Sequence, residues 1–255
     1  MRPAPVIQGP FRHCDQNQRV AVVLVAHGSR DPRAAESTEA LTRAVADAHP
    51  EWEVHASYLD HAGPRPLDVL TWLETAGHRR AVLVPLLLTA AYHGKVDVPA
   101  VVDQARDAGL RIDVRTSDVL GPVSELLLAG LIRRLPVAEL DAVVLAAAGT
   151  RDAAARETVA EAATALGALL GVPCTVAYAS AAAPTAAEAV TSLQAARVGV
   201  AAYFLAPGRL YDIAMDSARS AGAVVVAPPL GDAPELVALI GDRVHDTTRQ
   251  RLIAA

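Results

Sequence analysis

Two histidines stand where apolar runs of the chain end, and they have the chemistry to bind a metal ion or accept a proton. His27 closes a run at residues 21–26, and His93 follows a second run at residues 81–88. A neutral imidazole is a common ligand for divalent transition metals, and its ordinary pKa lies near physiological pH. The pair therefore predicts metal chemistry or general acid–base chemistry.

The chain supplies a control for these histidines because the same pattern occurs twice. Residues 22–31 recur as residues 143–152, and the turn Gly-Ser-Arg-Asp is kept as Gly-Thr-Arg-Asp. Ala148 stands in the place of His27, and Leu210 falls on the place of His93 when no gap is introduced. Since the second copy lacks both histidines, the fold does not require them. We expect both to be catalytic residues and metal ligands.

Apolar runs alternate with helical patterns along both halves, which predicts strands buried on both faces and hence parallel sheets. The expected strands lie at residues 21–26, 54–59, 81–88, 112–114, 142–147, 174–178, 198–205 and 224–227. The repeat is too long for a solenoid unit. We expect a tail (1–19), an N-terminal domain with the histidines (20–136) and a degenerate C-terminal copy (140–250), with a cleft between the two flavodoxin-like α/β domains.

The fold class also predicts where the histidines meet. In a small doubly wound sheet with strand order 2-1-3-4, strands 1 and 3 are neighbours, and ligands bind beyond their carboxyl ends. Asp31 is a good helix N-cap and Pro32 suits the first helical position. The helix amides would then point back toward His27 and create a corner that favours anions.

Composition limits the function classes. The 255 residues carry a formal net charge of −5 and are 52% hydrophobic. This charge disfavours nucleic acids and anionic membranes as partners. The apolar run at 81–92 is too short to span a bilayer. The chain has two cysteines, and neither belongs to a Cys-x-x-Cys motif. We therefore expect a cytoplasmic protein without an iron–sulfur cluster, and residues 1–19 do not resemble a signal peptide.

Together these motifs resemble those of the class II chelatases, the family of cobaltochelatases and siroheme ferrochelatases that insert metal into sirohydrochlorin. The hallmark is a strand that ends in His-Gly-Ser-Arg and a later loop with His a few residues before Asp-x-Pro. Here these are residues 27–30 and His93 with residues 97–99. The resemblance runs from about residue 21 to 244 and matches the fused two-domain form with a degenerate second half.

The resemblance implies a sirohydrochlorin chelatase, a lyase of tetrapyrrole synthesis. It favours Fe2+ insertion to give siroheme; the alternatives are a cobaltochelatase of cobalamin synthesis and a non-catalytic protein that binds metal or tetrapyrrole. The divalent metal, Fe2+ or Co2+, would be a substrate, with no permanently bound cofactor. The partners would be metal and anionic tetrapyrrole, bound by a monomer or homodimer.

The resemblance also implies site residues. The family usually has a Phe-Leu-Glu after its second strand; this chain has Tyr58-Leu59-Asp60, so Asp60 is a third catalytic candidate whose side chain is one methylene shorter. Ser29, Arg30, Lys95 and Arg209 are the expected substrate-binding residues.

Two structural readings remain open at this point, and one competing function is disfavoured. Ser29 and Arg30 persist as Thr150 and Arg151, so a structural role in the turn fits them equally well. Asp60 is as compatible with a turn or cap role as with a functional one. A histidine phosphatase would need Arg directly before the His, whereas this chain has Ala26. We expect the second half to form the far wall of a single active site.

Overall fold

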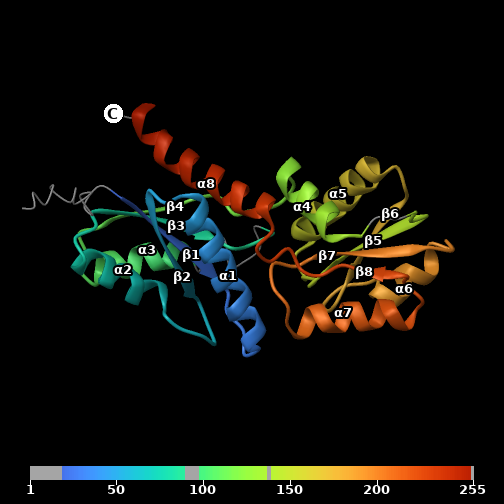
Figure 1. Ribbon diagram of the computed structural model, residues 1–255. Coiled ribbons are helices and arrows are strands. Elements are labelled where there is room, and N and C mark those ends of the chain that lie inside the picture. Colours follow the sequence, from blue (N-terminus) through green and yellow to red (C-terminus); the bar gives the residue numbers. More distant parts are fainter. Residues whose placement is uncertain (1–18, 90–97, 137–138, 254–255) are drawn as a thin grey trace, which may run out of the picture.

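The computed structural model describes residues 19–89, 98–136 and 139–253, arranged around two sheets that lie side by side (Figure 1). The first half contains β1 (Val20–Ala26), α1 (Pro32–Ala48), β2 (Trp52–Tyr58), α2 (Pro66–Thr75), β3 (Arg80–Pro85), α3 (Val98–Asp107), β4 (Asp113–Thr116) and α4 (Glu125–Arg134). The second half contains β5 (Ala142–Ala147), α5 (Ala153–Leu170), β6 (Cys174–Tyr178), α6 (Ala186–Ser192), β7 (Val198–Tyr203), α7 (Arg209–Ser220), β8 (Val225–Val226) and α8 (Pro234–Ile253).

Both sheets are parallel and have the same topology. Their strand orders are β2-β1-β3-β4 and β6-β5-β7-β8. The central strands β1 and β5 are buried along most of their length, as continuous Val, Leu and Ala runs predict. The expected α/β fold with two four-stranded parallel sheets is therefore confirmed, and strands 1 and 3 of each half are neighbours.

Two of the apolar runs extend beyond the strands that they contain. β3 ends at Pro85 rather than at residue 88, and β7 ends at Tyr203 rather than at residue 205. After β3 the chain turns, because the Leu87 N–H donates to the Pro85 carbonyl at 2.9 Å. The apolar residues that follow each strand instead line cavities between the halves. A run of apolar residues therefore does not by itself mark where a strand stops.

The two halves exchange their last helices. α4 belongs to the first half but packs on β7 and α5, whereas α8 packs on α1 and β3 of the first half. Figure 1 shows α8, in red, over the first sheet and α4 beside α5 over the second. The apolar side of α8, which includes Leu236 and Ile240, is buried in a core cluster that contains residues of both halves.

Polar contacts fix this exchange at several points. The Arg243 guanidinium on α8 donates to the Val119 carbonyl at 2.9 Å, and Arg134 on α4 donates to the Leu230 carbonyl at 3.0 Å. The buried Tyr203 hydroxyl of β7 donates to the Pro122 carbonyl at 2.6 Å and lies 3.1 Å from the Leu88 carbonyl. The halves therefore share one core, and the cleft between them has fixed walls.

Across the described ranges, no helix has both the length and the apolar character that crossing a bilayer would require.

Candidate functional site

The turn after β1 places His27 at the carboxyl edge of the first sheet. His27 follows Ala26, the last residue of β1, and its side chain is exposed. The Asp31 N–H donates to the Ser29 hydroxyl at 3.1 Å, and the Asp31 carboxylate accepts the Arg33 N–H at 3.0 Å as the N-cap of α1. Thr150 accepts the Asp152 N–H in the same way, also at 3.1 Å. This contact of Ser29 therefore belongs to the turn, whatever else the residue does.

The loop after β2 brings Asp60 against the same turn. The Asp60 N–H donates to the His27 carbonyl at 2.8 Å, which extends the pairing of β1 and β2 by one residue. Gly28 adopts a φ of +92°, and a Cβ at its position would overlap the Asp60 carbonyl group. Gly149 in the second half adopts +93° and lies in the same way under Ser180. The repeat therefore keeps the turn but replaces both His27 and Asp60, by Ala148 and Ser180.

The Asp60 carboxylate is ionised and partly exposed. It accepts the His61 N–H at 2.8 Å, and it lies 3.4 Å from His61 Nε2 and 3.7 Å from an Arg65 terminal nitrogen. The His61 N–H lowers the pKa of Asp60 most, burial opposes this, and the Arg65 cation and the imidazoles of His61 and His27, when protonated, lower it further. The Arg65 guanidinium also donates to the Leu59 carbonyl, which holds this loop together. A permanent negative charge thus lies close to His27, where it would attract a cation.

His27 lines two cavities. One, of about 590 Å³, lies within the first half, and its lining includes Asp60, Arg65 and Asp68 together with Gln104 of α3. The other, of about 280 Å³, lies between the halves; its lining includes His27 and Ser29 together with residues 204–207, which follow β7. The second half therefore forms a wall opposite His27.

The cleft has a second cavity that mirrors this arrangement. A space of about 310 Å³ is lined by Ala148 and Thr150 after β5 and by residues 86–89 after β3. Leu86 and Phe204 contribute to both cavities between the halves. Because Ala148 replaces His27 here, the cleft has one end with an imidazole and one end that is largely apolar.

The predicted site residues fall into three groups. His27, Asp60 and Ser29 come together at the edge of the first sheet. Arg30 and Arg209 are exposed and do not appear among the described residues that line these cavities. His93 and Lys95 lie outside the described residues. The metal-ligand role of His93 therefore stays a prediction. Within the described ranges, no three His, Cys, Asp or Glu side chains are grouped as metal ligands.

Residues missed by sequence analysis are Asp68, Gln104 and Arg33. Asp68 and Gln104 lie on α2 and α3, whose packing no local motif reveals. Arg33 had a visible signal, because Ala154 stands at its place in the second copy.

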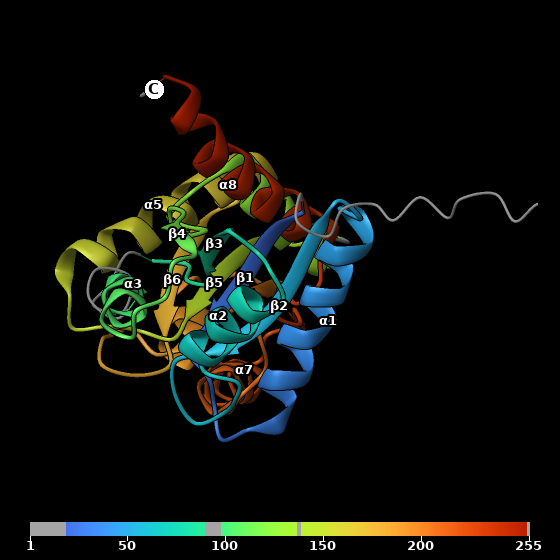
Figure 2. The same cartoon turned by 90° about the vertical axis from the view of Figure 1, so that its left-hand side faces the viewer.

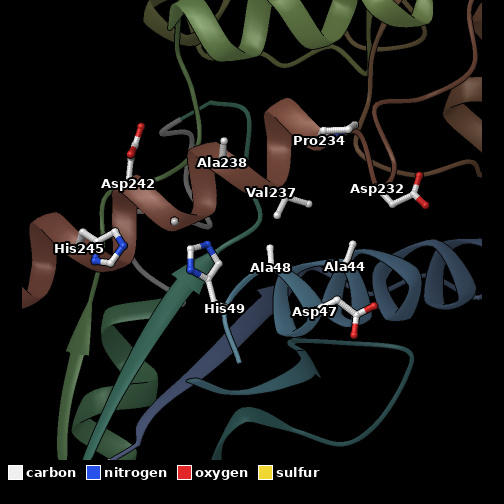
Figure 3. Close-up of a pocket in the computed structure, with 11 residues that line it drawn as sticks. Ala44, Asp47, Ala48, His49, Asp232, Pro234, Val237, Ala238, Asp242 and His245 are labelled. Carbon is white, nitrogen blue, oxygen red and sulfur yellow. The ribbon is translucent and has the colours of Figure 1, made fainter. Parts of the chain in front are cut away.

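A larger cavity, of about 750 Å³, lies between α1 and α8 and away from these residues (Figure 3). His49 and His245 lie at one end of it, and the His49 ring stacks on Trp52 at 3.8 Å. His27 precedes the N-terminus of α1, whereas His49 follows its C-terminus, and 17 helical residues span roughly 25 Å. This cavity is therefore separate from the turn that carries His27.

Comparison with known proteins places the chain in a family. The CbiX family model matches it twice, over residues 21–136 and 142–247. A sirohydrochlorin cobaltochelatase from Methanococcoides burtonii is 22% identical over 86 residues, which are 34% of this chain and 66% of that protein. The curated relatives are matched over less than two thirds of their own length, 66% in one and 28% in another.

Solved structures of similar fold support the architecture. SirB from Bacillus subtilis with Fe3+ superposes with a TM-score of 0.77 at 22% identity, over 90% of this chain and 95% of SirB. CbiX, the terminal enzyme for siroheme biosynthesis in denitrifying bacteria, gives 0.62 at 20% identity, over 89% of this chain and 98% of that chain. These likenesses confirm the chelatase-like fold. Because the family model matches both halves, the motif-based resemblance is also confirmed: this chain belongs to the CbiX family.

Proposed function

We propose that this protein is a sirohydrochlorin chelatase that inserts a divalent metal into the ring within the cleft between its halves. The observation that carries the proposal is that His27 lines both the cavity between the halves and the adjoining cavity of the first half that contains Asp60, whereas the second copy keeps the turn and has Ala148 and Ser180 instead. Turn geometry alone does not need an imidazole or a carboxylate. We therefore assign these two side chains a role in the reaction rather than in the fold.

Metal insertion requires that a divalent cation lose water and that two pyrrole nitrogens lose their protons. A neutral His27 imidazole is suited to bind the metal or to accept one of these protons. Asp60 supplies a negative charge beside it, and its lowered pKa keeps that charge at neutral pH. His93 is the proposed second metal ligand, as the family resemblance implies. The metal thus acts as a substrate and leaves with the product.

The walls of the cleft suit a large flat ring. Leu86 and Phe204 lie in both cavities between the halves, so they offer apolar surface to the faces of a tetrapyrrole. The N-termini of α1 and α7, which follow the two lining segments, offer amide groups to its carboxylates. We propose one ring per chain, with its metal site toward His27. A chain with two halves would then supply both walls of the site itself, and it would work in the cytoplasm as a monomer or a homodimer.

We favour Fe2+ as the metal, with Co2+ as the alternative. The chain has no histidine-rich store that would concentrate metal, which fits a housekeeping ferrochelatase. SirB, with the same fold, is known both with Fe3+ and with cobalt, and the Methanococcoides relative is named a cobaltochelatase, so these proteins support either metal. First-row metal affinities follow a general order, so supply in the cell contributes to the choice.

The test is to mix the purified chain with sirohydrochlorin and either Fe2+ or Co2+ without oxygen and follow the visible spectrum. We expect metallation faster than in the protein-free control, and faster with Fe2+ than with Co2+ once each protein-free rate is subtracted. A spectral shift that stops at one ring per chain, without turnover, would instead identify a carrier. Faster insertion of Co2+ would reverse the proposed metal preference.

A further inference from the structure

Arg33 connects the two halves beside the cleft. Its Nε donates to Asp31 at 3.0 Å, and a terminal nitrogen lies 2.5 Å from the same carboxylate. The terminal nitrogens also reach Asp212 on α7, at 2.6 and 3.4 Å. One guanidinium is thus held between a carboxylate of the first half and a carboxylate of the second. Both carboxylates raise the pKa of Arg33, so its positive charge is permanent.

This ion pair is next to the cavity that contains His27. Ala34 and Ala35, which follow Arg33, line that cavity from the first half, and Pro207 lines it from the segment before α7. A Cβ on Gly208 would be 4.0 Å from the Ser29 hydroxyl. Figures 1 and 2 both show the N-terminal end of α1 beside α7. A ligand that enters between the halves at this point would pass Arg33.

Comparison of the two copies distinguishes Arg33 from neighbouring residues that the fold itself needs. The N-cap Asp31 persists as Asp152, which accepts the Ala154 N–H at 3.0 Å just as Asp31 accepts the Arg33 N–H. Ala154 stands in the place of Arg33, so the helix start does not need an arginine. Arg30, by contrast, is kept as Arg151. Arg33 therefore follows the pattern of His27 and Asp60, which occur only in the first copy.

Stability does not explain the contact with Asp212. The Arg33 side chain is 47% exposed and that of Asp212 is 39% exposed, and water and salt screen such pairs strongly. A guanidinium fork, however, is the group that best recognises a carboxylate, through paired charge-assisted hydrogen bonds. Asp31 already orients one side of this fork. The other side faces Asp212, whose carboxylate has the chemistry of a substrate side group.

We infer that Arg33 binds a carboxylate of the tetrapyrrole substrate at the position that the Asp212 carboxylate occupies in this structure. This inference rests on the proposed function. Asp212 acts as an internal competitor: a polycarboxylate ring displaces it, which releases the contact of α1 with α7 as the ring enters. A ligand without carboxylates does not compete for Arg33, so the ion pair between Arg33 and Asp212 stays in place. Arg33 therefore contributes to specificity for an anionic ring.

The test uses the full chain and measures binding of metal-free sirohydrochlorin by its absorbance, followed by KM and kcat for metallation. We expect Arg33→Ala to raise Kd and KM at least about tenfold, which corresponds to roughly 1.4 kcal/mol. We expect the Kd and KM of Arg33→Lys to lie between those of wild type and Arg33→Ala, because lysine keeps the positive charge but lacks the planar pair of donors. Asp212→Asn should lower Kd and KM, since the competitor is removed. Arg43→Ala, at an exposed arginine of the same helix, is the matched control and should behave as wild type.

Two further readouts separate this role from a purely structural one. Co2+ binding in the absence of the ring should be the same in Arg33→Ala as in wild type, because the metal ligands are untouched. A ring with esterified carboxylates should bind equally to both proteins. If Arg33→Ala and Asp212→Asn weaken binding equally, the pair only holds the halves together and the inference is wrong; unchanged Kd in both variants also overturns it.

The inference and the proposed function can fail separately. If the wild type binds the ring but does not metallate it, the proposed function fails while the Kd comparison still decides the role of Arg33. If the wild type binds no ring, both are wrong.

Discussion

The backbone of Gly28 lies directly against the carbonyl group of Asp60, with no room for a side chain between them. The neighbouring Asp60 N–H donates to the His27 carbonyl at 2.8 Å. Backbone contacts therefore hold the two candidate catalytic residues beside each other. Substitution of either side chain should leave this arrangement in place, whereas substitution of the glycine should disturb it.

Gly28→Ala should destabilise the protein by about 1–3 kcal/mol and lower metallation activity, because the residue must hold a φ of +92° and its Cβ would meet Asp60. Gly222→Ala is the matched control, since Gly222 has the same φ of +92° but nothing within 4 Å of its Cβ position. Urea unfolding of both variants separates the contact from the strain of φ. Equal losses would show that Asp60 moves aside without cost.

Metallation activity should fall below about pH 6, because a protonated imidazole neither binds metal nor accepts a proton. Asp60 does not cause this loss. The His61 N–H and nearby positive charges lower its pKa, so the carboxylate stays ionised well below that pH. The measurement is kcat/KM against pH for wild type and Asp60→Asn, after the non-enzymatic rate is subtracted. The decline should persist in Asp60→Asn and should not move to higher pH, since the lost negative charge had favoured the imidazolium. If kcat/KM of Asp60→Asn did not decline at low pH, the loss of activity in wild type would be due to protonation of Asp60.

The exchange of α4 and α8 should make the chain unfold in a single step. Trp52 and Trp72 are the only tryptophans and both lie in the first half, so fluorescence reports that half while far-ultraviolet circular dichroism reports both. The two urea curves should coincide, because neither sheet keeps its covering helix when the other half unfolds. Fluorescence and dichroism midpoints that differ would show that each half is stable alone.

Much of the fold could be predicted because each half repeats a local pattern. Buried strands, the N-cap at Asp31 and the strand order all follow from apolar runs, turn residues and topology rules. The exchange of α4 and α8 could not be predicted, since an apolar helix face fits either sheet and the short connection after α4 does not fix which one it covers.

The site was predictable where one residue and its repeat carried the signal. Ala148 identifies His27 as a residue that the fold does not need. Asp60 was expected only from the family resemblance, and its counterpart Ser180 is identified by the backbone contacts of the structure. Arg33 was missed although Ala154 stands at its place in the repeat, because its partner Asp212 is 179 residues away and no local motif joins them. Arg209 was expected to face the substrate across the cleft, but in the structure it begins α7 as an exposed residue, and the neighbouring lining comes from the segment before it.

The most direct measurement is the metallation rate of His27→Ala beside that of His245→Ala, an exposed histidine on α8. His27→Ala should lose about a hundredfold or more of the rate, the low end of what a positioned general base contributes, while its circular dichroism and unfolding midpoint stay near wild type. His245→Ala should keep full activity. A His27→Ala protein that inserts metal at the wild-type rate would contradict the assignment of metal chemistry to the first copy, and one that fails to fold would show that His27 is structural.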